Sequence, residues 1–84
     1  MINVSEIPSI VLKRVGKKII EQPTFSLCFV ADDGRLVEVD ECICTSAFHR
    51  NRTINIRIAS SGEIRKVRTI TIIRYNGVET VVMP

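Results

Sequence analysis

Side chains branched at the β-carbon dominate this chain and constrain its fold more than any other feature. Isoleucine occurs 13 times, valine 10 times and threonine 6 times, which makes 29 of the 84 residues. Such side chains lose rotamer freedom in helices and pack well on the pleated surface of a sheet. Because aromatic residues are only 5% of the chain and tryptophan is absent, we expect a mainly β fold with an aliphatic core.

After residue 24 the sequence consists of alternating apolar runs separated by glycine turns. Asn76-Gly77 is the strongest hairpin signal, because both positions of the favoured two-residue turn need a positive φ. Residues 32–34 and 60–62 mark two further turns. We expect five strands, which run over residues 24–31, 35–44, 53–60, 64–75 and 78–84.

The hydrophobic pattern fixes the register of the first expected hairpin. A three-residue loop that ends with Gly34 in the left-handed conformation places Phe29 opposite Val37. Leu27 then faces Val39, so the apolar residues of both strands share one face. A two-residue loop would set Phe29 against an acidic residue, because a slip of one residue turns every side chain to the other face.

Two further expectations follow from the alternation of apolar residues. Ile43 falls on the same parity as Val39, which predicts that both point into the core. In the fourth expected strand, Ile64 and Val67 have opposite parity, so the alternation breaks. We interpret this break as a bulge or sharp bend near Arg65-Lys66.

Residues 5–16 carry a weak helical pattern ahead of these strands. Ser5 is a candidate N-cap, and Gly16 is a candidate for the left-handed residue that ends a helix. A short strand over residues 17–21 is expected to follow, and an extended conformation of the first segment stays open. The apolar residues that share one face of the expected helix are Ile7, Ile10, Val11 and Val15.

These elements predict a single domain over residues 1–84, with a helical lead-in over 1–22 and a strand meander over 24–84. A five-stranded antiparallel meander this short usually curls into a small, partly open barrel, because closure hides the unpaired edges. The layout is similar to that of SH3-like barrels, and the leading helix is similar to the Sm-like layout. This resemblance concerns architecture and implies no function.

The charges are unevenly distributed, which raises the possibility of a nucleic-acid partner. The net charge is +3, yet residues 42–78 hold seven basic side chains and a single acid, Glu63. The planar guanidinium suits phosphate groups, and Phe48 stands beside the arginines of one turn. The alternative is that the cations only protect edge strands from aggregation. The candidate contacts to nucleic acid are Arg50, Arg52, Arg57, Arg65, Lys66 and Arg68.

The last expected hairpin has two largely apolar faces. One face belongs to the core, and the other needs a cover, either the N-terminal helix or another chain. The sequence therefore predicts a non-enzymatic module that binds itself or another protein, with nucleic-acid binding as the alternative function. The candidate residues for this contact are Ile70, Ile72, Tyr75, Val78, Val81 and Met83.

Catalysis, cofactor binding and a small-molecule substrate are not expected. Cys28, Cys42, Cys44 and His49 lack the spacing of a zinc site, and the glycines are isolated turn residues rather than a phosphate loop. A membrane span needs about 18 consecutive apolar residues, which this chain lacks, and the N-terminus does not resemble a signal peptide. Three cysteines are too few for a disulfide framework, so we expect a cytoplasmic setting.

Overall fold

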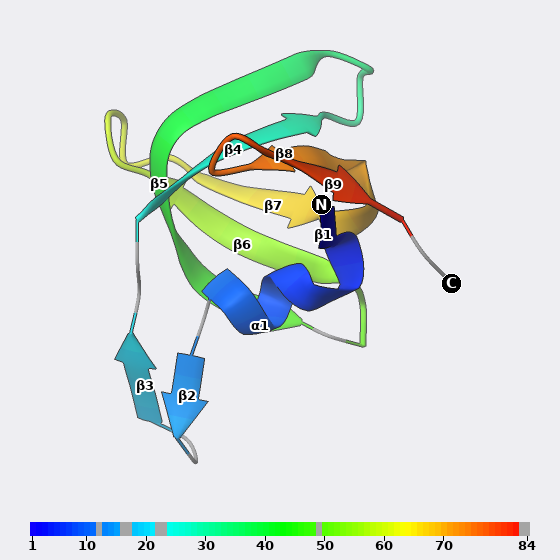
Figure 1. The fold of residues 1–84 in the computed structure, drawn as a ribbon. Coiled ribbons are helices and arrows are strands. Elements are labelled where there is room, and N and C mark those ends of the chain that lie inside the picture. Colours follow the sequence, from blue (N-terminus) through cyan, green and yellow to red (C-terminus); the bar gives the residue numbers. More distant parts are fainter. Residues whose placement is uncertain (12, 16–17, 22–23, 49, 83–84) are drawn as a thin grey trace.

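The computed structural model describes residues 1–11, 13–15, 18–21, 24–48 and 50–82 (Figure 1). They form a large mixed sheet, a separate two-stranded hairpin and a short N-terminal helix. In chain order the elements are β1 (Ile2–Asn3), the 3₁₀ helix η1 (Val4–Glu6), α1 (Ile7–Val11), β2 (Lys13–Val15), β3 (Lys18–Glu21), β4 (Phe25–Val30), β5 (Leu36–Phe48), β6 (Thr53–Ile58), β7 (Ile64–Arg68), the 3₁₀ helix η2 (Thr69–Thr71), β8 (Ile72–Tyr75) and β9 (Val78–Val81).

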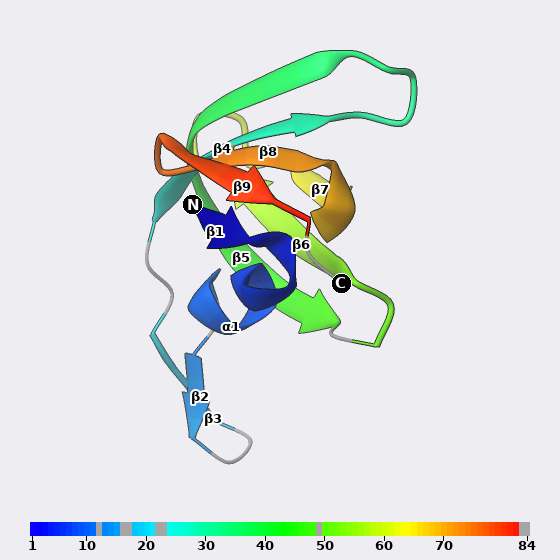
Figure 2. The ribbon, with the colours of Figure 1, turned by 45° about the vertical axis from the view of Figure 1, so that its right-hand side comes forward.

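The large sheet has the strand order β1-β9-β8-β4-β5-β6-β7 and does not close within the described part of the chain. All neighbouring strands are antiparallel except β1 and β9, which run parallel. The β2–β3 hairpin lies apart from this sheet in both views (Figures 1 and 2). The mainly β fold with a short N-terminal helix is confirmed, whereas the sheet has seven strands instead of five.

The helical segment is shorter than the predicted residues 5–16: η1 begins at Val4 and α1 ends at Val11. The predicted N-cap Ser5 is wrong, because Asn3 is the N-cap of η1, and its side-chain oxygen accepts a hydrogen bond from the backbone nitrogen of Ser5 at 3.1 Å. The helical path ends at Val11 because residues 13–15 pair with β3 instead of continuing the helix. The strand expected over residues 17–21 is present as β3, while Lys17 and the predicted cap Gly16 lie outside the described residues.

The register predicted for the first hairpin is confirmed. Phe29 pairs with Val37 and Leu27 with Val39, and Gly34 has a φ of +86°. Beyond Leu27 the register of β4 and β5 shifts, so that Phe25 pairs with a cysteine, Cys42.

This shift overturns the expectation that Ile43 points into the core. The bulge adds one residue to β5, which reverses the parity of the side chains from Cys42 to Cys44. A further register shift against β6, between Cys44 and Ser46, reverses it again. Cys42 and Cys44 therefore take the buried positions, and Ile43 is only half-buried between them.

The fourth expected strand is in fact two strands joined by η2. The pairing of β6 with β7 is continuous from Thr53 and Arg68 to Arg57 and Ile64, so no bulge lies at Arg65-Lys66. The parity changes instead in the 3₁₀ turn over residues 69–71, where the chain passes from β7 at one edge of the sheet to β8 beside β4.

The β8–β9 hairpin turns at Asn76 and Gly77, whose φ values of +52° and +78° fit the predicted turn. Asn76 also fastens this turn to β4: its backbone nitrogen donates to the carbonyl of Ser26 at 3.0 Å, and its side-chain oxygen accepts from the nitrogen of Ser26 at 2.9 Å. The turn residue therefore extends the pairing between β8 and β4.

A second bulge sets the inward face of β8. Leu27 pairs with Tyr75 and Phe29 with Ile72, so that two steps along β4 match three steps along β8. Ile72 and Tyr75 therefore both point into the core. The residues between them, Ile73 and Arg74, are more exposed.

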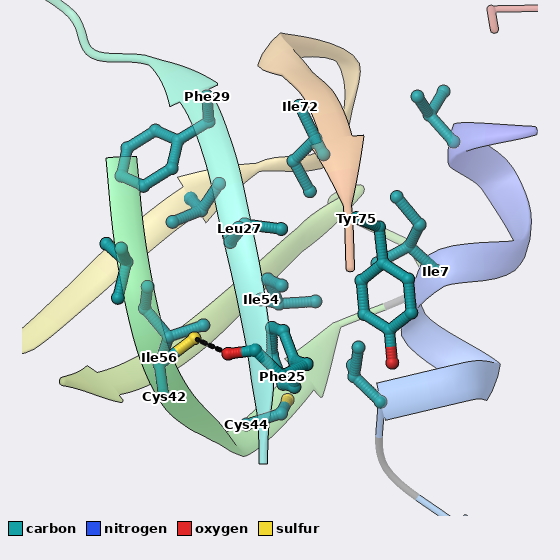
Figure 3. Packing of buried hydrophobic residues seen from close by; sticks show 14 residues of the cluster. Ile7, Phe25, Leu27, Phe29, Cys42, Cys44, Ile54, Ile56, Ile72 and Tyr75 are labelled. Atoms are coloured by element: carbon teal, nitrogen blue, oxygen red, sulfur yellow. Dashed lines mark hydrogen bonds between the residues drawn. The ribbon is translucent and has the colours of Figure 1, made fainter. Parts of the chain in front are cut away.

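The core joins the sheet to the N-terminal helix (Figure 3). The rings of Phe25 and Tyr75 lie 5.2 Å apart between centroids. Tyr75 lies close to Ile7 of α1 (Figure 3), and the five-residue helix is too short to be stable without such packing. The fully buried side chains of this core include Ile7, Val11, Cys42, Cys44, Ile54 and Ile56.

Cys42 is one of the fully buried residues of this core. Its thiol donates to the carbonyl oxygen of Phe25 at 3.4 Å, across the bulge between β4 and β5 (Figure 3). Burial, together with the neighbouring Cys44, raises the pKa of Cys42 to about 12. Burial also raises the pKa of Tyr75, and the proximity of Cys42 adds to that effect.

We expect Ile54→Ala to lower the free energy of unfolding by about 2–5 kcal/mol, because the lost methyl groups leave a cavity in a fully buried site. The matched variant Ile64→Ala removes the same atoms from a side chain that is 57% exposed. It should change the free energy of unfolding by less than about 0.5 kcal/mol. Urea denaturation of both variants checks this, and equal losses would contradict the assignment of β6 as the core strand.

We expect the free energy of unfolding to fall as the pH rises above about 9. The thiol of Cys42 ionises near 9.0 in the unfolded chain and near 12 in the folded one. Its contribution to stability is therefore complete below pH 9 and decreases between pH 9 and 12, by at most about 1.4 kcal/mol per pH unit. Urea denaturation between pH 7 and 11 should give a smaller slope for Cys42→Ala than for the parent chain. Equal slopes would contradict this reading.

Candidate nucleic-acid interface

Three cationic side chains of β6 and β7 share the outward face of the sheet. Ile54, Ile56 and Val67 point into the core, so the residues that alternate with them point outward. The cross-strand pairs on this outward face are Thr53 with Arg68, Asn55 with Lys66, and Arg57 with Ile64. Arg57, Lys66 and Arg68 are all exposed on it.

The turn between β5 and β6 adds Arg50 and Arg52 at the end of the sheet where Arg68 lies. Both are exposed, and Arg52 has a left-handed backbone with a φ of +55°. The carbonyl of Arg52 accepts two hydrogen bonds from Thr69, one from the backbone nitrogen at 2.9 Å and one from the hydroxyl at 3.1 Å. These bonds hold the turn against η2, directly after Arg68. We call the resulting set the cationic face, and its members are Arg50, Arg52, Arg57, Lys66 and Arg68.

No carboxylate of the described chain forms an ion pair with the cationic face. The carboxylates that do form ion pairs contact other arginines: Asp33 with Arg35, Glu63 with Arg65 and Glu38 with Arg74. The exposed Asp40 and Glu41 line a groove of about 500 Å³ beside Ile58, Ala59 and Ser60, on the far half of β5. These acids lie away from the turn that carries Arg50 and Arg52, whereas Arg57 pairs with Ile43 and so lies near this groove.

Arg65 is the candidate that the structure separates from the cationic face. It pairs with Ile56 across the strands and therefore lies on the core side of β7. Its guanidinium lies 5.8 Å from the centre of the Phe29 ring and 4.0 Å from a carboxylate oxygen of Glu63. Arg65 thus links β7 to β4 through a cation–π contact and is not directed to a ligand on the outward face.

An aromatic ring and two polar side chains lie on the outward face as well. Phe48 pairs with Thr53 and is 43% exposed. Asn55 donates from its amide nitrogen to the hydroxyl of Ser46 at 3.1 Å. Sequence reasoning placed Phe48 beside the arginines but missed Asn55 and Ser46. The sequence did contain a signal for Asn55: isoleucine alternates with polar residues over residues 53–58, which indicates that Asn55 points outward.

The apolar residues proposed for self-association do not form one surface. Ile72 and Tyr75 are 2% and 7% exposed, so their side chains belong to the core. Ile70 and Val78 are exposed, Val81 is half-buried, and Met83 lies outside the described residues. The buried side chains of α1 pack into the same core as Ile72 and Tyr75, so this helix covers the inner face of the β8–β9 hairpin, not its outer face.

A second polar cluster lies on the outward side of β4, β5 and β8. One nitrogen of Arg74 lies 2.8 Å from a carboxylate oxygen of Glu38 and 3.5 Å from the thiol of Cys28. The guanidinium covers a thiol that is otherwise buried, beside a cavity of about 170 Å³. Within the described ranges, no three histidine, cysteine or acidic side chains are grouped as metal ligands.

The helices of the described chain are too short to cross a lipid bilayer. Comparison with known proteins gave no relative: no family model, curated protein or solved structure matches the chain.

Proposed function

We propose that this protein is a non-enzymatic binding module that holds nucleic acid by its phosphate backbone on the cationic face. The observation that carries this proposal is the set of five exposed cations on β6, β7 and the turn before β6, without an ion pair to any described carboxylate. Cationic side chains that serve only the stability of the fold would be expected to form ion pairs with nearby carboxylates. A polyanion supplies the missing negative charge and releases its own counterions when it binds.

The position of these side chains suits a repeating row of phosphates. Lys66 and Arg68 lie two residues apart on β7, which separates their Cα atoms by about 6.6 Å. Neighbouring side chains can therefore reach different phosphates. The net charge of +3 is modest, but five exposed cations without an ion pair to a described carboxylate give the cationic face a stronger local potential than the net charge implies.

The proposal extends to the type of β fold and to the cellular compartment. We infer a partly open five-stranded barrel of SH3-like or Sm-like layout, made of β8, β4, β5, β6 and β7. The order of these strands, the 13-residue β5 that bends around the core and the 3₁₀ turn between β7 and β8 support it (Figure 1). A cytoplasmic setting is supported by the state of the three cysteines, all of which are thiols.

Assembly through an apolar surface is the second candidate function. The observation in its favour is a set of exposed aliphatic side chains on η2, β8 and β9 and directly after β9. Single exposed aliphatic residues are ordinary, but these four belong to one continuous stretch of chain that α1 leaves uncovered. They are Ile70, Ile73, Val78 and Val82.

We expect neutralisation of the cationic face to weaken nucleic-acid binding and its dependence on salt. Fluorescence anisotropy with a labelled 20-nucleotide strand between 50 and 200 mM salt measures both. In the double variant Lys66→Gln/Arg68→Gln the slope of log affinity against log salt should decrease in magnitude by about 1.4, because each lost phosphate contact on a single strand lowers it by about 0.7. Arg35→Gln removes one charge beside Asp33 on the β4–β5 loop and should leave the slope unchanged. Absence of binding at 50 mM salt, or an equal loss in the control, would refute the proposal.

We expect light scattering at high protein concentration to give a mass that is a multiple of 9.5 kDa if the second candidate function is correct. Val78→Asp places a charge at an exposed position at the start of β9 and should then return the mass to that of one chain. Leu36→Asp is the matched control, because Leu36 is exposed at the start of β5, away from that hairpin. A single-chain mass of the parent protein at about 1 mM would rule out self-association.

A further inference from the structure

We propose that the cationic face takes single-stranded nucleic acid in preference to duplex, with a base stacked on the ring of Phe48. This inference rests on the proposed function and names the form of its ligand. It adds a role for an aromatic side chain that the core does not use.

The exposure of Phe48 sets it apart from the other aromatic residues. Phe25, Phe29 and Tyr75 are at most 7% exposed and belong to the core, whereas Phe48 is 43% exposed. An exposed ring is not strange by itself. Phe48 is the last residue of β5, and the turn that follows carries Arg50 and Arg52, which are both exposed. A polyanion bound to these arginines would therefore lie close to the ring.

The strand register places the ring of Phe48 in one row with Arg68. Phe48 pairs with Thr53, and Thr53 pairs with Arg68, so the three residues form one row across β5, β6 and β7. Two strand spacings separate the ends of this row, roughly 10 Å. A strand of nucleic acid that crosses the sheet along this row meets a stacking surface at β5 and a guanidinium at β7.

A duplex cannot use the ring in this way. Its bases are stacked on one another, and its grooves admit a helix or a two-stranded ribbon rather than the broad face of a sheet. A single strand exposes the faces of its bases, and stacking on aromatic rings combined with backbone neutralisation is the usual way in which proteins hold it.

Ser46, Asn55 and Lys66 form the next row of the outward face, beside the row of Phe48, Thr53 and Arg68. The Asn55 amide donates to the hydroxyl of Ser46 at 3.1 Å, which fixes the orientation of the carboxamide. The backbone carbonyl of Asn55 accepts from Thr45 at 3.3 Å, so β6 is also held at this point. Asn55 lies on the outward face of β6, and its carboxamide oxygen can accept a hydrogen bond from the edge of a stacked base.

The test compares the affinities of the parent chain and of Phe48→Ala for three probes at one salt concentration. The probes are a 20-nucleotide thymidine strand, a 20-base-pair DNA duplex and long-chain inorganic polyphosphate. We expect the parent chain to bind the single strand more tightly than the duplex. Loss of one stacking contact should weaken single-strand binding by about 5-fold to 100-fold, while the affinities for duplex and polyphosphate change by less than 2-fold.

Two further variants separate stacking from an effect on the fold. Phe48→Tyr keeps an aromatic ring and should retain single-strand affinity within about 2-fold. Leu36→Ala removes an exposed apolar side chain far from the cationic face and should have no effect on any probe. Thermal melting of each variant shows that the fold is intact.

Each outcome decides between the two proposals. Equal affinity for strand and duplex, or equal losses for all three probes in Phe48→Ala, refutes the stacking role and leaves the cationic face standing. Loss of single-strand affinity in Phe48→Tyr equal to that in Phe48→Ala refutes stacking as well. Absence of binding to all three probes refutes the proposed function itself.

Discussion

The alternation of inward and outward side chains along β6 is the constraint on which the rest of the structure depends. Ile54 and Ile56 are fully buried, and this forces Asn55 and Arg57 to the outward face. Because β7 pairs with β6 without a shift, the same alternation sets Val67 inward and Lys66 and Arg68 outward. The cationic face is therefore a consequence of core packing: the side chains that stabilise the sheet determine which charges reach the solvent.

The positions of the bulges mark the limit of what could be predicted from sequence. The three-residue loop and its register followed from the alternation of Phe29 and Val37, and the Asn76-Gly77 turn followed from its need for positive φ. The bulges in β5 and β8 contain no glycine and carry no comparable requirement on residue type. A bulge inserts one extra residue into one strand, so its position depends on the pairing with the neighbouring strand. The bulge beside Cys42 thus reversed the parity of Ile43, and the one in β8 turned both Ile72 and Tyr75 inward.

The candidate site was predictable to the extent that it depends on unbroken pairing. Arg57, Lys66 and Arg68 were named from charge alone, and their shared face follows from the continuous register of β6 and β7. Arg65 was also named, but its parity places it over the ring of Phe29. The number of charged residues does not distinguish an arginine on the outward face from one on the core side of a strand. The long aliphatic part of an arginine can cover the edge of a core as well as extend into solvent. The exact pairing decides which of these happens.

The proposed function requires that the ligand contact the outward side of β6, β7 and the end of β5, and leave the outward side of β4 and β8 free. A titration of the ¹⁵N-labelled protein with a short thymidine strand, followed by NMR, tests this most directly. The account predicts that the largest shifts fall on the amides of Phe48, Arg52, Asn55, Lys66 and Arg68, while the outward side of β4 and β8 around Cys28 and Arg74 stays unchanged. Shifts centred on Cys28 and Arg74, or spread evenly over the chain, would contradict it.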